Sequence, residues 1–235
     1  MKPTRFLVGL LLIGTGAAAG HSLRGLAGQT AAGLPAEPPQ TAAAAFPKDV
    51  YAETGNRLPA IKRDDLDDAG RKLYDSRGPV DSFGPGAIRL YSQPVAEHMA
   101  AVNDYLRNKA GLDPRLVQLA ILVTARENDS EYVWTAHEPQ GLKAGLPPEV
   151  IDAVRYRKPV DRLAEKDAVI IQLARGAVGK HHVDSELAAH AIRLFGRQGM
   201  VNYVALMGDY AATTVLLNAF DQHIRPADKA RLPIP

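Results

Sequence analysis

The sequence predicts an all-α protein: one helical domain that follows an N-terminal leader and a flexible linker. Apolar residues recur at spacings of three and four in several segments, whereas apolar and polar residues never alternate for more than a few positions. Several of these segments begin with a proline or an acidic residue, as helices commonly do. About 46% of the 235 residues are hydrophobic, which is enough for a substantial core.

Residues 1–19 have the order of a secretory signal peptide. Lys2 and Arg5 give a positive start, residues 6–13 are apolar, and residues 17–19 are three alanines that suit a cleavage site. The apolar part, even extended to the alanines, is about 14 residues, short of the ~20 that span a bilayer. An uncleaved N-terminal anchor is the alternative interpretation.

The leader predicts that the protein is exported, to the periplasm or outside the cell, and that the mature chain has no membrane span. Residues 20–50 follow the leader and are rich in Ala, Gly, Gln and Pro, which is typical of a flexible linker. The helical domain is therefore expected over residues 51–235.

Charge and cysteine content exclude several classes of function. The formal net charge of +2 is small and mixed along the chain, so nucleic acid is not an expected partner. The chain has no cysteine, which excludes disulfides, thiolate metal sites, lipid attachment to cysteine and thiol catalysis. A domain of this size does not need disulfides outside the cell. We expect no cofactor and no metal.

Residues 113–145 read as two helices joined by a short polar turn. Asp113 suits the N-cap and Pro114 the first helical position. An apolar stripe follows at helical spacing, formed by Leu116, Leu119, Ala120, Val123 and Thr124. The turn is predicted at Asn128, Asp129 and Ser130, any of which could cap the second helix.

The second helix carries the only tryptophan of the chain. Ser130, Val133, Trp134 and His137 are three, four and seven residues apart, which places them on one helix face. A histidine on an apolar face beside an indole is the most informative feature of the sequence.

The helices before this pair are less regular. A helix is expected over 64–75, and the glycines and prolines of residues 78–86 predict a loop without regular structure. The helix over 93–106 should turn Val95, Met99, Val102 and Leu106 inward, with His98 on the surface.

After the central pair, helices are expected over 148–154, 163–178, 186–195 and 198–220. The last is long and apolar nearly all round, which is typical of a helix buried centrally or between subunits. His181 and His182 should lie in a loop, and neighbouring histidines cannot chelate one metal from a helix face.

The sequence resembles the carboxymuconolactone decarboxylase and alkylhydroperoxidase D superfamily over roughly residues 78–220. The most specific part is S-E-Y-x-W-x-x-H at residues 130–137, preceded by R-L-x-x-L-A-I-L-x-x-A-R. The resemblance implies a helical domain that assembles as trimers or hexamers. In the peroxidase branch two cysteines precede the histidine, and they correspond here to Ser130 and Val133. The resemblance also implies a Glu at the position of Gln118.

His137, Gln118 and Glu131 are the candidate catalytic residues. The resemblance makes His137 the proton-transferring group, and the Gln118 amide should fix its tautomer. Glu131 is an alternative acid near the same turn, on a different face. A buried histidine with a purely structural hydrogen bond to Gln118 explains the pattern equally well.

Trp134, Arg126 and Ser130 are the candidate substrate-binding residues. Arg126, or alternatively Arg115, would bind a substrate carboxylate. Trp134 alone is also typical of a core residue, and Ser130 of a helix cap.

Two functions remain open. One is an exported lyase, isomerase or hydrolase acting on a small organic acid or lactone; the other is a non-catalytic binding or scaffold protein. Thiol peroxidase activity is disfavoured, because neither branch cysteine is present.

Overall fold

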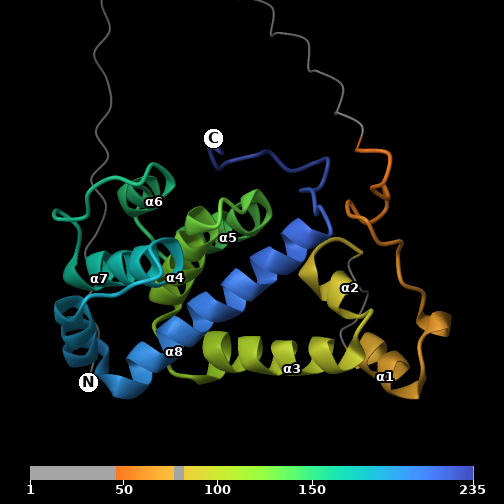
Figure 1. Ribbon diagram of the computed structural model, residues 1–235, viewed down its shortest axis with the longest axis horizontal. Helices are drawn as coiled ribbons and strands as arrows, with labels where there is room; N and C mark the ends of the chain where they lie inside the picture. Colours follow the sequence, from red (N-terminus) through yellow and green to blue (C-terminus); the bar gives the residue numbers. More distant parts are fainter. Residues whose placement is uncertain (1–45, 77–81, 235) are drawn as a thin grey trace, which may run out of the picture. The chain divides into compact units, whose positions relative to one another are not determined.

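Figure 1 shows the computed structural model, which describes residues 46–76 and 82–234. The predicted signal peptide and most of the predicted linker lie outside the described residues. Within them the chain is helical, and its one β-type pairing is an isolated antiparallel bridge between Tyr51 and Asn56. The predicted all-α class is therefore confirmed. The elements are η1 (Arg63–Asp65), α1 (Asp68–Ser76), α2 (Pro85–Arg89), α3 (Gln93–Asp104), η2 (Tyr105–Lys109), α4 (Pro114–Glu127), α5 (Glu131–Lys143), α6 (Pro148–Arg155), α7 (Glu165–Ala174), η3 (Arg175–Gly179) and α8 (Ser185–Ala219).

Helix α4 lies at the centre of the core and packs against α5, α6, α7 and α8. All eleven residues from Leu116 to Arg126 are buried, so the helix is covered on every side. Its start follows the prediction: the Asp113 side chain accepts a hydrogen bond from the Arg115 N–H at 2.8 Å, and Pro114 is the first helical residue.

Helix α5 begins after a tight turn at Asp129, whose φ is 47°. The predicted face is buried, with Ser130, Val133, Trp134 and His137 all inside. Ser130 occupies the N-cap position of α5, but its hydroxyl makes no capping hydrogen bond. The cap therefore has a preferred residue type without the interaction that usually explains the preference.

Helix α3 presents a different face from the one predicted. Val95 and Val102, expected to point inward, are 43% and 49% exposed, whereas Ala96 and Leu106 are buried. The prediction was wrong for the two valines and right for Leu106, whereas Met99 is partly buried. Within α3 itself the small Ala96 is the residue that is buried.

The glycine-rich loop before α3 also contains more structure than predicted. Pro85 begins the short helix α2, at the first helical position that suits proline. Gly84 precedes it with φ 96°, in the left-handed region, and a Cβ there would overlap the Tyr132 hydroxyl. Glycine is required at this position both by the backbone and by the close approach of α5.

Helix α8 combines the two C-terminal segments expected from the sequence. It runs over 35 residues but breaks at Gly196, which has φ 72° and ψ 166°. After the break, its inner side is buried against α4 and α7, including Tyr203, Leu206, Met207, Tyr210 and Leu217. On its outer side, an exposed row of apolar or small residues recurs at alternating spacings of four and three positions. We call this outer row the α8 stripe; it consists of Val201, Ala205, Gly208, Ala212 and Val215.

Among the described residues, α8 is the one helix that is long and apolar enough to cross a membrane, judged on length and composition alone. Core helices of globular domains meet the same criterion. In α8, 44% of the most apolar 18-residue segment is buried within the protein, and the helix packs on α4 and α7. Its position in Figure 1, beside α4 and across α3, fits a core helix.

Residues near the two ends of the described chain pack together around Gln222. Its side-chain carbonyl accepts hydrogen bonds from the Asn56 amide at 2.9 Å and from the Gly84 N–H at 3.0 Å. The next residue, His223, packs against Phe46 with ring centroids 5.2 Å apart. The helices are thus enclosed by irregular segments from both ends.

Candidate functional site

His137 and Gln118 face each other from neighbouring helices, as the sequence predicts. The His137 Nδ1 and Gln118 Oε1 atoms are 2.9 Å apart, within hydrogen-bond distance, and both side chains are buried. With the amide oxygen as acceptor, Nδ1 carries the proton and Nε2 carries the free lone pair. Of the described residues, none makes a hydrogen bond to Nε2.

Tyr210 and Arg107 complete the surroundings of this imidazole. The Tyr210 ring, from α8, lies edge-on to the imidazole with centroids 5.1 Å apart and planes at 88°. Arg107 lies in η2, a single π-helical turn that extends α3, and its charge acts on both His137 and Tyr210. Such turns occur often at functional sites. Neither residue could be predicted from the sequence as part of the site, because a π turn has no periodic signature and Tyr210 is distant from His137 along the chain.

Burial is the main influence on the protonation of His137. The side chain is only 8% exposed, and this desolvation, with a smaller contribution from the Arg107 cation, lowers the pKa of His137 to about 3. The imidazole is therefore neutral at any physiological pH. A carboxylate at position 118 would oppose this shift, and Gln118 does not.

A layer of polar contacts between α2, α3 and α8 adjoins Tyr210. The Asn103 amide donates to the Asp209 carboxylate at 2.8 Å, and Arg89 donates to the Thr213 hydroxyl. Burial raises the pKa of Tyr210, so its hydroxyl stays protonated. This layer joins the outer helices to the side of α8 that carries the ring facing His137.

Arg126 and Glu131, predicted as site residues, contact the C-terminal tail rather than His137. The Glu131 carboxylate accepts the N–H groups of Arg231 at 2.6 Å and Leu232 at 2.9 Å. The buried Arg126 guanidinium donates to the Pro233 carbonyl at 3.0 Å and pairs with Asp129 at 2.6 Å. The alternative, Arg115, pairs with the buried Asp167 at 2.7 Å.

Trp134 is a core residue with a specific polar partner. It is fully buried, and its indole N–H donates to the Glu138 carboxylate at 2.8 Å. Arg155 pairs with the same carboxylate and lies over the indole, with its guanidinium carbon 5.5 Å from the ring centroid. Glu138 can reach the indole because it follows Trp134 by four residues and therefore shares its helix face.

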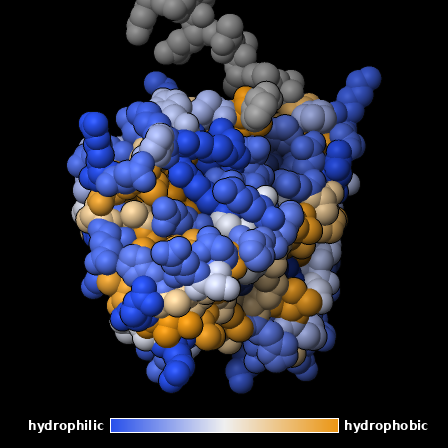
Figure 2. All heavy atoms as spheres, turned by 60° about the vertical axis from the view of Figure 1, so that its left-hand side comes forward, coloured by the Kyte–Doolittle hydropathy of each residue, from blue (hydrophilic) through white to orange (hydrophobic). Residues whose placement is uncertain are grey.

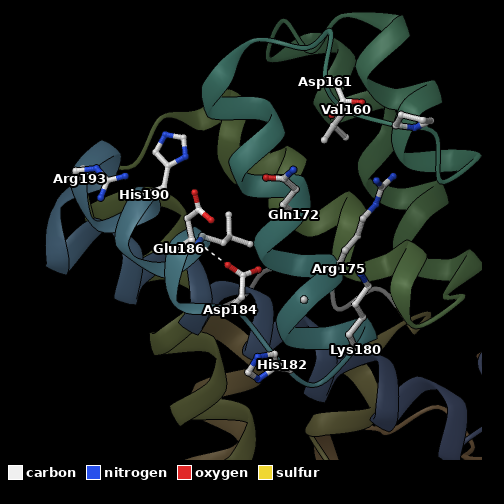
Figure 3. A pocket seen from close by; sticks show the side chains of 13 residues that line it. Val160, Asp161, Gln172, Arg175, Lys180, His182, Asp184, Glu186, His190 and Arg193 are labelled. Atoms are coloured by element: carbon white, nitrogen blue, oxygen red, sulfur yellow. Dashed lines mark hydrogen bonds between the residues drawn. The ribbon is translucent and has the colours of Figure 1, made fainter.

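Neither His137 nor Gln118 lines any of four cavities on the described part of the surface. The largest, about 770 Å³, lies between α7, η3 and the first turns of α8. Figure 3 shows Asp184 and Glu186 on one side of it and Arg175 and Lys180 on the other.

Metal ligation finds no support in the described residues, where no group of three or more histidines and carboxylates could hold an ion. His98 is exposed, as expected. His181 and His182 lie exposed in the loop between η3 and α8, and His181 has a positive φ of 56°.

The fold and the site together define a class of protein: an all-α domain in which an amide from one core helix holds a histidine from the next. Residues 93–168 match the model of the carboxymuconolactone decarboxylase family. The matched region runs from α3 into α7 and includes Arg107, Gln118 and His137. The matched region, like the rest of the chain, contains no cysteine. No curated protein matches the chain.

Proposed function

We propose that this is an exported carboxymuconolactone decarboxylase-like protein that acts on a small organic acid or lactone at His137. The reaction would be of lyase, isomerase or hydrolase type. The hydrogen bond between Gln118 and His137 carries the proposal, because it fixes one tautomer and leaves the lone pair of Nε2 available as a base. Gln118 holds the ring without exchanging a proton.

An anionic substrate suits this site for an electrostatic reason. The Arg107 cation lowers the pKa of His137, so the unliganded imidazole is a weak base. A carboxylate bound at Arg107 would offset that charge and raise the pKa of His137, so that basicity increases when substrate arrives. Arg107 thus replaces Arg126 as the proposed partner of a substrate carboxylate.

A non-catalytic binding protein on the same fold is the second candidate. It is favoured by the depth of His137 and its pKa of about 3, which is far from the value that serves a general base near neutral pH. In this case the imidazole and Arg107 would bind an anion without transforming it.

The test is to incubate the purified chain with a panel of small lactones and organic acids and to follow products by NMR. With a substrate in hand, His137→Ala should abolish turnover, and Gln118→Glu should move the pH profile upward because a carboxylate raises the imidazole pKa. Arg193→Gln, on the exposed first part of α8, is a matched control that should behave like the parent.

Binding without turnover, lost in Arg107→Gln, would establish the second candidate instead. Turnover that survives in His137→Ala would refute the first. Export is tested separately: N-terminal sequencing of protein from its own host should begin near Gly20. A full-length chain in the cytoplasm would contradict export.

A further inference from the structure

A second cavity, of about 560 Å³, lies at the break of α8, and neither His137 nor Gln118 lines it. It is bounded by the loop before α4, the start of α7, and α8 on both sides of Gly196. Its apolar wall includes Leu112, Leu116 and Tyr203. The volume suits a small organic ligand.

Asn202 is the residue that distinguishes this cavity. Its side chain lines the cavity and is only 8% exposed, yet its amide makes no hydrogen bond to any described residue. The cavity leaves this amide open to solvent rather than sealed in the core, since it is not one of the fully buried unpaired groups. It is therefore free to accept a ligand that enters the cavity and replaces water there.

The charges around the cavity favour an anion. Lys166 and Arg197 both line it, and neither forms an ion pair within the described ranges. Asp113 is the one acidic residue in the lining, and its carboxylate already accepts from the Arg115 N–H. The break at Gly196 also places the first turn of the second part of α8 in the wall, where the helix dipole is positive.

We propose that this cavity binds a small monocarboxylate with an apolar body, at a site separate from His137. The carboxylate would accept from the Asn202 amide between Lys166 and Arg197, and the apolar body would lie on Leu112, Leu116 and Tyr203. One net positive charge in the lining fits one carboxylate. The larger cavity beside α7 offers no such combination, because exposed groups of both signs dominate its lining.

The experiment is a titration of the full chain with benzoate, followed by calorimetry and by amide NMR. Benzamide, which has the same ring without the charge, is the matched probe. Benzoate should bind, with benzamide at least about tenfold weaker, and should shift the amide signals of Gly196 and Gly199. The Gly141 amide, beside Gln118, reports on the other site and should not shift.

Asn202→Leu should lower benzoate affinity by about tenfold or more, since it removes the amide and keeps the volume. Should that variant fail to fold, Lys166→Gln combined with Arg197→Gln changes only exposed residues and should also weaken binding and its salt dependence. Arg193→Gln removes an equal charge elsewhere on α8 and should leave affinity unchanged.

Three results would overturn the proposal: equal binding of benzoate and benzamide, shifts at Gly141 without shifts at Gly196 and Gly199, or full affinity in the folded Asn202→Leu variant. None of them bears on turnover at His137, so this site and the proposed function stand or fall separately.

Discussion

At the scale of single residues, His137 illustrates how burial determines chemistry. Its burial and, to a smaller extent, the nearby Arg107 cation favour the neutral form of the imidazole, which faces the Gln118 amide and the edge of the Tyr210 ring. The same residue in contact with a carboxylate would be a far better base. Burial therefore sets the low basicity of the site histidine, and the neutral amide at position 118 does not offset it.

This environment predicts a dependence of stability on pH. The unfolded imidazole takes up a proton near pH 6.5, whereas the folded one stays neutral down to about pH 3. In that window the unfolded state binds more protons, so the free energy of unfolding should fall as the pH is lowered. The contribution of His137 between pH 6.5 and 4 should be about 3 kcal/mol.

Urea unfolding of the parent and of His137→Gln at both pH values measures this contribution. The variant lacks the titrating group but keeps a polar side chain, so the difference in stability between it and the parent should narrow at pH 4. A difference that stays constant across the two pH values would contradict the assignment.

At the scale of helices, Gly84 before α2 and Gly196 within α8 are both positions that favour glycine, but for different physical reasons. Gly84 and Gly196 both have positive φ, but an added Cβ would overlap the Tyr132 hydroxyl at Gly84 and meets nothing within 4 Å at Gly196. Gly196→Ala should therefore cost about 1–3 kcal/mol, the strain of a backbone conformation that glycine alone adopts readily. Gly84→Ala should cost clearly more.

Thermal melts of the two alanine variants give this comparison directly. Because φ is similar in kind at both positions, Gly196→Ala serves as the control for backbone strain. Equal melting temperatures would mean that Tyr132 moves aside without cost.

The helices show where sequence reasoning succeeds and where it stops. The central pair was predictable, because capping residues and apolar spacing are local signals, and the antiparallel geometry then placed Gln118 opposite His137. Arg107 and Tyr210 were not predictable, since their approach to His137 depends on a π turn and on the packing of α8. The outward turn of Val95 and Val102 was missed for a related reason: an apolar stripe does not specify which surface covers it.

At the scale of the whole molecule, the exposed apolar residues suggest assembly. The α8 stripe and the outer side of α3 carry valines that are 43% to 65% exposed, and Figure 2 shows one face on which hydrophobic residues form patches among hydrophilic ones. Soluble monomers rarely expose continuous apolar rows. We propose that the protein forms a homo-oligomer, a trimer or hexamer, through these helices.

Sedimentation equilibrium at micromolar concentration should show this oligomer. Val215→Glu, at a position 65% exposed in the single chain, should lower the association state while leaving helix content unchanged. Lys229→Glu, on the exposed C-terminal segment, is the charge-reversing control. A parent that sediments as a monomer would refute the proposal.

The hydrogen bonds from the C-terminal tail to Glu131 determine which substitutions the tail tolerates. The Glu131 carboxylate binds two successive main-chain N–H groups, and Arg126 binds a main-chain carbonyl, so the tail is held mainly through its main chain. The Arg231 side chain adds a long ion pair with Glu138, at 3.9 Å. Arg231→Ala should leave the tail in place. Arg231→Pro deletes one of the two donors, and limited proteolysis should then cut the tail well before the helices. Equal resistance of the two variants would show that Leu232, buried beneath, suffices alone.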